Sequence, residues 1–150
     1  MQFLTGLHPL FVHFPIALYI IYVLFEITGL FYKENHFTKA AQYLLFITLI
    51  TDVMSALTGN QATGTADHLS MGRSSEIKEH ESTANIFIWF VVFLFVGRTY
   101  LLLKKKLIKK YKIVITVVSL IGLLLVFETA DHGGKLVYKF GVGTDLMREK

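Results

Sequence analysis

The chain contains no cysteine, and only two of its 150 residues are proline. Without thiolates there can be no disulfide, no iron–sulfur cluster held by cysteine, and no haem attached covalently as in c-type cytochromes. Any metal bound by side chains must therefore be held by nitrogen or oxygen. Charged residues are also scarce, at 17% of the chain, whereas 53% are hydrophobic, and the mean hydropathy is +0.54. This composition is typical of a membrane protein.

Four apolar stretches have about the length needed to cross a bilayer, roughly 17 to 25 residues. They lie near residues 9–31, 40–57, 84–103 and 113–127. We therefore predict one all-α domain over residues 1–150, an integral membrane four-helix bundle with an outer loop at 60–83 and an outer tail at 133–150. The first stretch lacks a basic start and a small-residue cleavage site, so we expect it to remain in the mature protein.

The positions of lysine and arginine predict the orientation of this bundle. Basic residues gather after the first and third stretches: Lys33, Lys39, Arg98, Lys104, Lys105, Lys106, Lys109, Lys110 and Lys112. Positive charge marks the cytoplasmic side, so both termini are expected to face outward. The lysine run lies against the lipid headgroups in this arrangement, which makes membrane lipid, and not nucleic acid, its expected partner.

Glycine and proline predict where the helices bend and end. Pro15, inside the first stretch, is expected to loosen the helix beside His13, because proline removes one helical hydrogen bond. Gly59 and Gly64 are expected to end the second helix. The pair Gly133–Gly134 is expected to end the fourth helix directly after His132.

Five of the six histidines fall on the predicted outer side, namely His8, His13, His68, His80 and His132. His13 lies about one turn inside an apolar stretch, where an ionisable side chain is costly and indicates a functional site. Asp52, Asn85 and Glu128 add polar groups from the other three stretches. Polar groups in such bundles face inward and form sites for cofactors, ions or protons. Glu26, deeper in the first stretch, is expected to pair with another helix.

The spacing of the histidines leaves three interpretations open. His8 and His13 are five residues apart, about 140° around a helix, so they cannot grip one small ion together. A zinc, iron or copper ion could be held by His13, His80 and His132 with one carboxylate. Haem could instead be held by single histidines from two helices. The third interpretation is a structural subunit of a membrane complex, in which the polar groups only fix the helix register.

Haem would also need space and counter-charges. Small residues on the outer side predict a flat space for a cofactor: Ala17, Ala56, Gly59 and Ala84. Arg73, Lys78 and Lys135 are placed to pair with haem propionates at the rim, since propionates need cations at the water boundary. The glycine-rich tail is expected to cover the cofactor from outside, with Tyr138 and Lys139 near the rim.

Four motifs carry a resemblance to a known family: LHPLFVHFPIAL at 7–18, ALTG at 56–59, HESTAN at 80–85 and DHGGKLVYKFGVG at 131–143. The chain resembles a bacterial family of small four-helix membrane proteins known only as a domain of unknown function. Some members are joined to c-type cytochrome domains, and haem binding through the histidines has been suggested for the family. Carried over by motif, the resemblance implies roles for His8, His13, His80 and His132.

We therefore predict a membrane b-type cytochrome, or cytochrome-like electron-transfer subunit, that binds haem b through His13 and either His80 or His132. Its expected location is the bacterial inner (cytoplasmic) membrane. Its expected partners are quinol and a periplasmic c-type cytochrome or respiratory complex, since the chain has no cytochrome c segment of its own. Such a subunit need not be a stand-alone enzyme. A non-haem metal-ion binding or transport protein and a structural subunit are the alternatives.

Overall fold

The computed structural model describes residues 8–32, 35–66 and 74–139 of the chain. The described residues form four helices, α2 (His8–Phe31), α3 (Asn35–Ala66), α4 (Ser74–Leu103) and α5 (Lys109–Tyr138), and no β-strand. All four are long and apolar enough to cross a membrane. The prediction of an all-α bundle with four membrane-spanning helices is confirmed.

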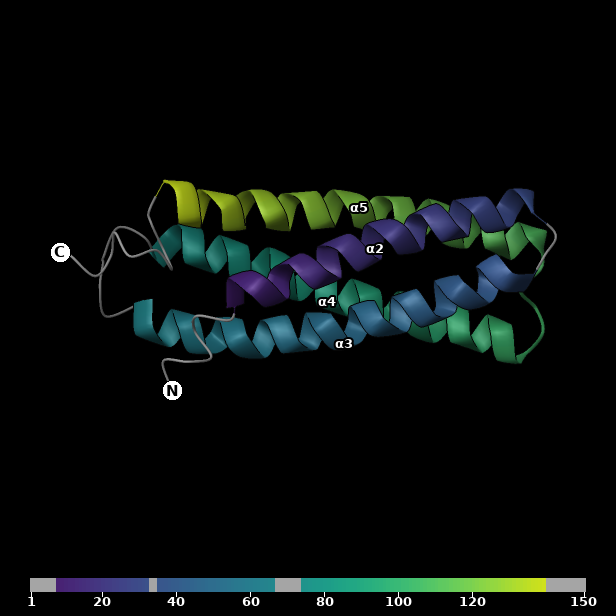
Figure 1. The fold of residues 1–150 in the computed structure, drawn as a ribbon, viewed down its shortest axis with the longest axis horizontal. Helices are drawn as coiled ribbons and strands as arrows, with labels where there is room; N and C mark the ends of the chain where they lie inside the picture. Colours follow the sequence, from purple (N-terminus) through teal and green to yellow (C-terminus); the bar gives the residue numbers. More distant parts are fainter. Residues whose placement is uncertain (1–7, 33–34, 67–73, 140–150) are drawn as a thin grey trace.

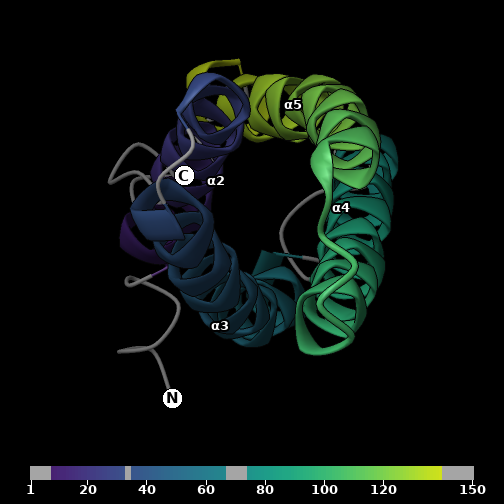
Figure 2. The same ribbon diagram turned by 90° about the vertical axis from the view of Figure 1, so that its right-hand side faces the viewer.

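The four helices form a ring in which successive helices run in opposite directions (Figures 1 and 2). Helix α2 packs against α3 and α5, and α4 packs against the same two neighbours. At one end of the ring α2 and α4 begin while α3 and α5 end. We call this the histidine end, because it holds His8, His80 and His132. The opposite end carries the turn at residues 104–108.

The helices at the histidine end are longer than the sequence predicts. Helix α3 continues through Gly59 and Gly64, and α5 continues through Gly133–Gly134, so the prediction that these glycines end their helices is wrong. Gly59 and Gly133 each lie against a histidine ring from another helix, and a Cβ at either position would press on that ring. Parts of the predicted outer loop and tail, residues 67–73 and 140–150, lie outside the described residues.

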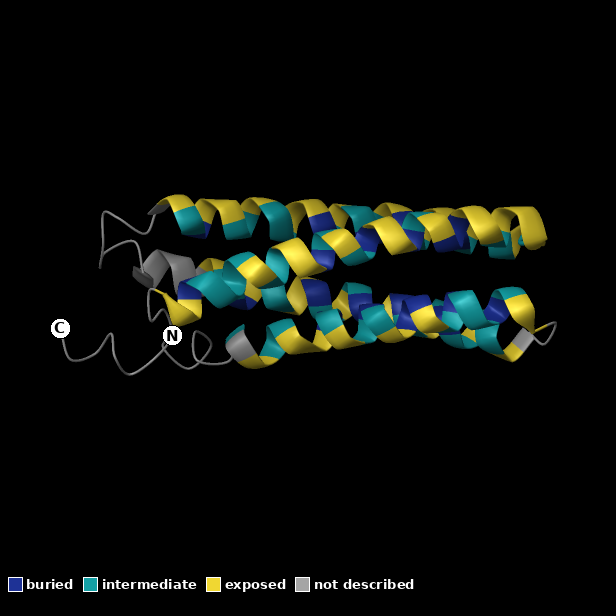
Figure 3. Ribbon diagram, turned by 90° about the horizontal axis from the view of Figure 1, so that it is seen from above, coloured by how far each residue is buried: buried dark blue, intermediate teal, exposed yellow. Residues whose placement is uncertain are grey.

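The outward faces of the helices are apolar. Exposed residues run along the outside of every helix (Figure 3), and they include Trp89, Phe93 and Leu124, exposed by 61%, 70% and 68%. A soluble protein of this size rarely exposes so many large apolar side chains. Lipid tails would cover them, as expected of a multi-pass membrane protein.

The middle of the bundle is held by two tyrosines that contact α5. Tyr19 Oη donates a hydrogen bond to the Ser119 carbonyl at 3.0 Å. The Ser119 hydroxyl donates to the Ile115 carbonyl at 2.8 Å, so Tyr22 Oη donates to Ser119 Oγ at 2.8 Å. A Cβ at Gly122 would clash with the Tyr19 hydroxyl and ring. The missing side chain at Gly122 therefore lets α2 and α5 approach closely.

A buried arginine joins the helices towards the opposite end. Arg98 on α4 is 1% exposed. Its guanidinium donates to Glu26 Oε1 at 2.5 Å, Gln42 Oε1 at 2.6 Å and the Thr38 carbonyl at 2.9 Å. Lys112 of α5 donates to Thr38 Oγ1 at 2.9 Å. The prediction that Glu26 pairs with another helix is confirmed, and the network links all four helices.

Candidate functional site: a cavity lined by histidines

A cavity of about 450 Å³ opens between the four helices at the histidine end. Its volume lies in the range of roughly 300–1,000 Å³ that is usual for small-molecule and cofactor sites. The wall is mostly apolar, and Ala56, Gly59 and Ala84 line it as the sequence suggested. Ala17, which the sequence grouped with them, is exposed on α2.

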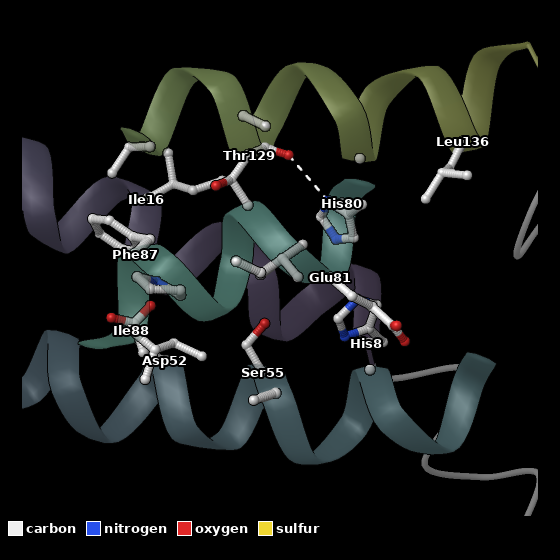
Figure 4. A pocket seen from close by; sticks show the side chains of 18 of the residues that line it. His8, Ile16, Asp52, Ser55, His80, Glu81, Phe87, Ile88, Thr129 and Leu136 are labelled. Carbon is white, nitrogen blue, oxygen red and sulfur yellow. Dashed lines mark hydrogen bonds between the residues drawn. The ribbon is translucent and has the colours of Figure 1, made fainter. Parts of the chain in front are cut away.

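His80 on α4 is oriented by a hydrogen bond to α5. Its Nδ1 lies 3.1 Å from the Thr129 carbonyl oxygen, and Figure 4 shows this contact at the cavity wall. A carbonyl only accepts hydrogen bonds, so the proton is on Nδ1 and the lone pair is on Nε2. Histidines that bind metals through Nε2 are held in the same way, by a carbonyl or carboxylate that accepts from the other ring nitrogen.

His8 at the start of α2 is oriented in the same manner by α3. Its Nδ1 lies 3.1 Å from Thr58 Oγ1, and the ring also hydrogen-bonds the Ser55 backbone. The Thr58 hydroxyl donates to the Met54 and Ser55 carbonyls at 3.1 and 2.9 Å, so it accepts from His8. The contact with Thr58 therefore occupies Nδ1 of the ring.

A glycine lies against each of these two rings. A Cβ built on Gly59 of α3 would lie 3.0 Å from His8 Cε1, and one built on Gly133 of α5 would lie 3.1 Å from His80 Cε1. Both separations are tighter than ordinary van der Waals contact. Each imidazole therefore turns Cε1, the carbon between its two nitrogens, towards the glycine of the neighbouring helix.

The site thus has a repeated design, with one oriented imidazole from the α2–α3 hairpin and one from the α4–α5 hairpin. Figure 4 shows both rings in the same cavity. Burial lowers the pKa of His8 below its ordinary value, and the nearby His80 lowers it further, although the hydrogen bond with the Ser55 backbone opposes both. His8 is therefore a neutral imidazole at neutral pH, which is the form that binds metals.

Asp52 adds a buried carboxyl group to the cavity wall. It is 3% exposed, it lines the cavity, and Oδ2 has no hydrogen-bond partner among the described residues. A buried polar atom without a partner is costly unless a ligand or ion satisfies it. Asp52 therefore indicates that the cavity is built to hold a polar or charged group.

The other predicted site residues differ in whether they line this cavity. His13 and Asn85 line it, and both have exposed side chains. Glu128 is exposed on α5. Tyr138 also lines the cavity, which places the end of α5 beside it. His13 and His80 therefore share a cavity, as the sequence suggested, and His8 joins them there.

His132 is turned towards α4 at the rim, where its Nδ1 lies 3.9 and 3.8 Å from carboxylate oxygens of Glu76 and Glu79. Lys135 forms an ion pair with Asp131 at 2.5 Å, so its charge already has a partner. Lys78, also a predicted partner of a propionate, is exposed on α4, and Arg73 and His68 lie outside the described residues.

The residues that orient the histidines were not predicted from the sequence. Thr58 and Thr129 contact rings from other helices, about 50 residues away in sequence, and no local spacing reveals such a pair. Glu76 and Glu79 were not predicted as neighbours of His132 either. Glu128, which the sequence grouped with the histidines, is not part of that cluster.

The chain matches a known family over almost its whole length. The family model, described as "Predicted membrane protein (DUF2231)", matches residues 5–146. No curated protein and no solved structure shows significant similarity to the chain. The match supports the membrane character of the chain and the family that its motifs indicate.

Proposed function

The chain belongs to the DUF2231 family of predicted membrane proteins, and we propose that it binds haem b between His8 and His80 and transfers electrons. One observation carries this proposal. Two imidazoles, one from each hairpin, are fixed through Nδ1 by the neighbouring helix and border the same cavity. His8 and His80 would hold the iron of one haem.

The residues around the cavity fit a haem in three respects. The ligands are nitrogens from different helices, so no doublet of histidines on one helix is needed. The wall is mostly apolar, with glycine or alanine at Ala56, Gly59, Ala84 and Gly133. The absence of cysteine excludes covalent c-type attachment, so a haem here would be held without a covalent bond, as haem b is. Haem held by two imidazoles would supply one-electron transfer, because no coordination position stays open for oxygen.

The protein's own groups have separate tasks in this proposal. Thr58 and Thr129 hold the two imidazoles in the tautomer that presents Nε2, and Gly59 and Gly133 let the rings sit against the helices. Asp52 is placed to hold or release a proton at Oδ2 when the charge in the cavity changes. A charge change in a poorly solvated cavity favours compensation by a nearby titratable group.

This ligand pair differs from the pair first expected from the sequence. That expectation joined His13 with His80 or His132. We propose His8 in place of His13 because the His8 ring has an orienting hydrogen bond and a close glycine contact, whereas the His13 side chain is exposed. His132 faces two carboxylates at the rim and suits a different ligand.

We further propose the bacterial inner membrane as the location, with the histidine end outside. The supporting observation is the exposed lysines near the opposite end, Lys104 to Lys106 and Lys109 to Lys110, since positive charge favours the cytoplasmic side. Haem near the outer face would be positioned between quinol in the membrane and a periplasmic c-type cytochrome. These two partners are part of the proposal.

Single histidine variants test the proposed ligands. We expect His8→Ala and His80→Ala each to abolish or grossly alter the reduced-minus-oxidised spectrum of the purified protein. The matched control is His36→Ala, since His36 is exposed on α3 towards the opposite end. His13→Ala should leave a spectrum like the wild type. Loss of the haem signal in His13→Ala but not in His8→Ala would instead assign the ligand to His13.

A further inference from the structure

Three ligating side chains meet at the rim of the histidine end, outside the set that we assign to haem. They are Glu76 and Glu79 on α4 and His132 on α5, and one ligand atom from each lies within 4.8 Å of the others. Glu76 and Glu79 are three residues apart, so both carboxylates lie on the same side of α4. The cluster therefore joins the first turns of α4 to the last turns of α5.

The burial of the His132 imidazole is not matched by a hydrogen bond within the described part of the chain. His132 Nδ1 is buried and has no hydrogen-bond partner among the described residues, although carboxylate oxygens of Glu76 and Glu79 lie 3.9 and 3.8 Å away. These distances exceed a hydrogen bond, which spans about 2.7–3.2 Å for nitrogen and oxygen. They are closer to the separation of two ligands on one tetrahedral zinc, about 3.4 Å for bonds of 2.0–2.1 Å.

Helix electrostatics accounts for only part of the arrangement. An acidic residue in the first turn of a helix is stabilised by the helix dipole, which accounts for Glu76. It does not account for a second carboxylate or for an imidazole aimed between the two. The nearby Lys135 forms an ion pair with Asp131 at 2.5 Å, and its charge also interacts with Glu76 and Glu79. Three carboxylates thus share one lysine, which leaves negative charge that a divalent ion would balance.

We propose that Glu76, Glu79 and His132 bind one first-row divalent cation, Zn²⁺ or Mn²⁺. Imidazole with carboxylates suits these ions, whereas Ca²⁺ and Mg²⁺ prefer ligand sets made wholly of oxygen. The side chains of Glu76 and Glu79 are 33% and 56% exposed, so water can complete the coordination and the ion can exchange. The site shares no ligand with the proposed haem and does not depend on it.

The bound ion would act as a clamp across the α4–α5 hairpin. Its ligands come from both helices, and it would add to the His80–Thr129 hydrogen bond that joins them at this end. An ion that binds only the folded protein stabilises it in proportion to the logarithm of its free concentration. Metal should therefore raise the temperature of unfolding.

Titration of the full-length protein tests the site. The protein is purified in detergent through an affinity tag without histidine and stripped with a chelator. We expect calorimetric titration with Zn²⁺ to show one strong site per chain, and Mn²⁺ to give the spin-resonance signal of a protein-bound ion. His132→Ala and the double variant Glu76→Gln/Glu79→Gln should each weaken binding by at least about tenfold, since each removes ligands.

Two control variants establish that the ion binds at this cluster. Glu128→Gln removes an exposed carboxylate one turn from His132 on α5 and should leave the affinity unchanged. His8→Ala/His80→Ala should also bind Zn²⁺ normally, which keeps the result independent of haem. Far-ultraviolet dichroism and gel filtration establish that each variant is folded.

Three results would overturn the proposal. They are absence of saturable binding in the wild type, equal affinity in the wild type and in His132→Ala, or a loss in Glu128→Gln as large as in Glu76→Gln/Glu79→Gln. Equal affinity would mean that His132 and the two carboxylates form only a proton-dependent ion pair.

Discussion

Gly133 has no Cβ, and this leaves room for the ring of His80 in its present position. A Cβ there would lie 3.1 Å from His80 Cε1, so the ring or the helix would have to move. Because the same ring is held by the Thr129 carbonyl at 3.1 Å, it has little freedom to move without losing that bond. Gly133 is therefore a positioning residue for the imidazole.

Gly133→Ala should disturb the site although alanine is the better helix former. Elsewhere in a helix, glycine to alanine gains roughly 0.5–1 kcal/mol, and Gly97, with nothing within 4 Å of its would-be Cβ, is the matched control. We expect Gly97→Ala to keep or raise the unfolding temperature and to keep the haem spectrum. Gly133→Ala should show no stability gain and a reduced haem content. A Gly133→Ala variant with the wild-type spectrum and a higher unfolding temperature would contradict this role.

The sequence predicts which residue types form the site, but not their orientation. The placement of His8, His13, His80 and His132 towards one end of the bundle follows from the apolar runs. The hydrogen bond that orients His80 is made by a backbone carbonyl, which every residue has, so no side-chain pattern marks it. The pairing of His132 with Glu76 and Glu79 likewise depends on how α4 and α5 pack.

The number and order of the helices can be predicted from the apolar stretches of the sequence. The positions at which α3 and α5 end beside the cavity cannot. Glycine normally disfavours a helix, and this led to the wrong prediction that α5 ends at Gly133. The cost is offset there by close packing on His80. The pairing of Glu26 with another helix could be predicted, since a carboxylate inside an apolar stretch requires a partner.

Arg98→Ala should strongly destabilise the bundle. It would leave the Glu26 carboxylate, 5% exposed, without its cation, and breaking a buried pair in this way costs about 3–5 kcal/mol. Lys110→Ala, which removes an exposed cation near the same end, should have little effect. The double variant Arg98→Met/Glu26→Leu should recover most of the loss, because no unpaired charge remains buried.

Unfolding in mixed detergent, followed by tryptophan fluorescence and dichroism, measures these differences in free energy. The assignment of Arg98 as the main link between helices fails if Arg98→Ala unfolds no more readily than Lys110→Ala.

For the molecule as a whole, orientation in the membrane is the feature that charge predicts and that the fold alone leaves undetermined. The fold does not distinguish the two orientations, because exposed residues run along the outside of every helix (Figure 3) and include many large apolar side chains. The lysines near Lys104–Lys110 supply the asymmetry. The family match agrees with membrane insertion, but it does not indicate which end of the bundle faces outward.

The absence of cysteine makes the orientation directly measurable, since each introduced cysteine would be the only one in the chain. A thiol reagent that cannot cross the inner membrane should label Lys78→Cys, exposed near the start of α4, in intact spheroplasts. It should label Lys104→Cys, exposed at the end of α4, only after the cells are lysed. The reverse pattern would place the histidine end in the cytoplasm.

The haem content of the wild-type protein decides whether the histidine cavity holds the proposed cofactor. The protein is purified in detergent from cells supplied with ample haem, and its reduced-minus-oxidised spectrum and pyridine haemochrome are recorded together with its iron content. We predict a sharp b-type α band, with iron and porphyrin in a fixed ratio to protein. A folded, colourless protein without porphyrin would contradict haem binding by His8 and His80, whether or not zinc or manganese binds at His132.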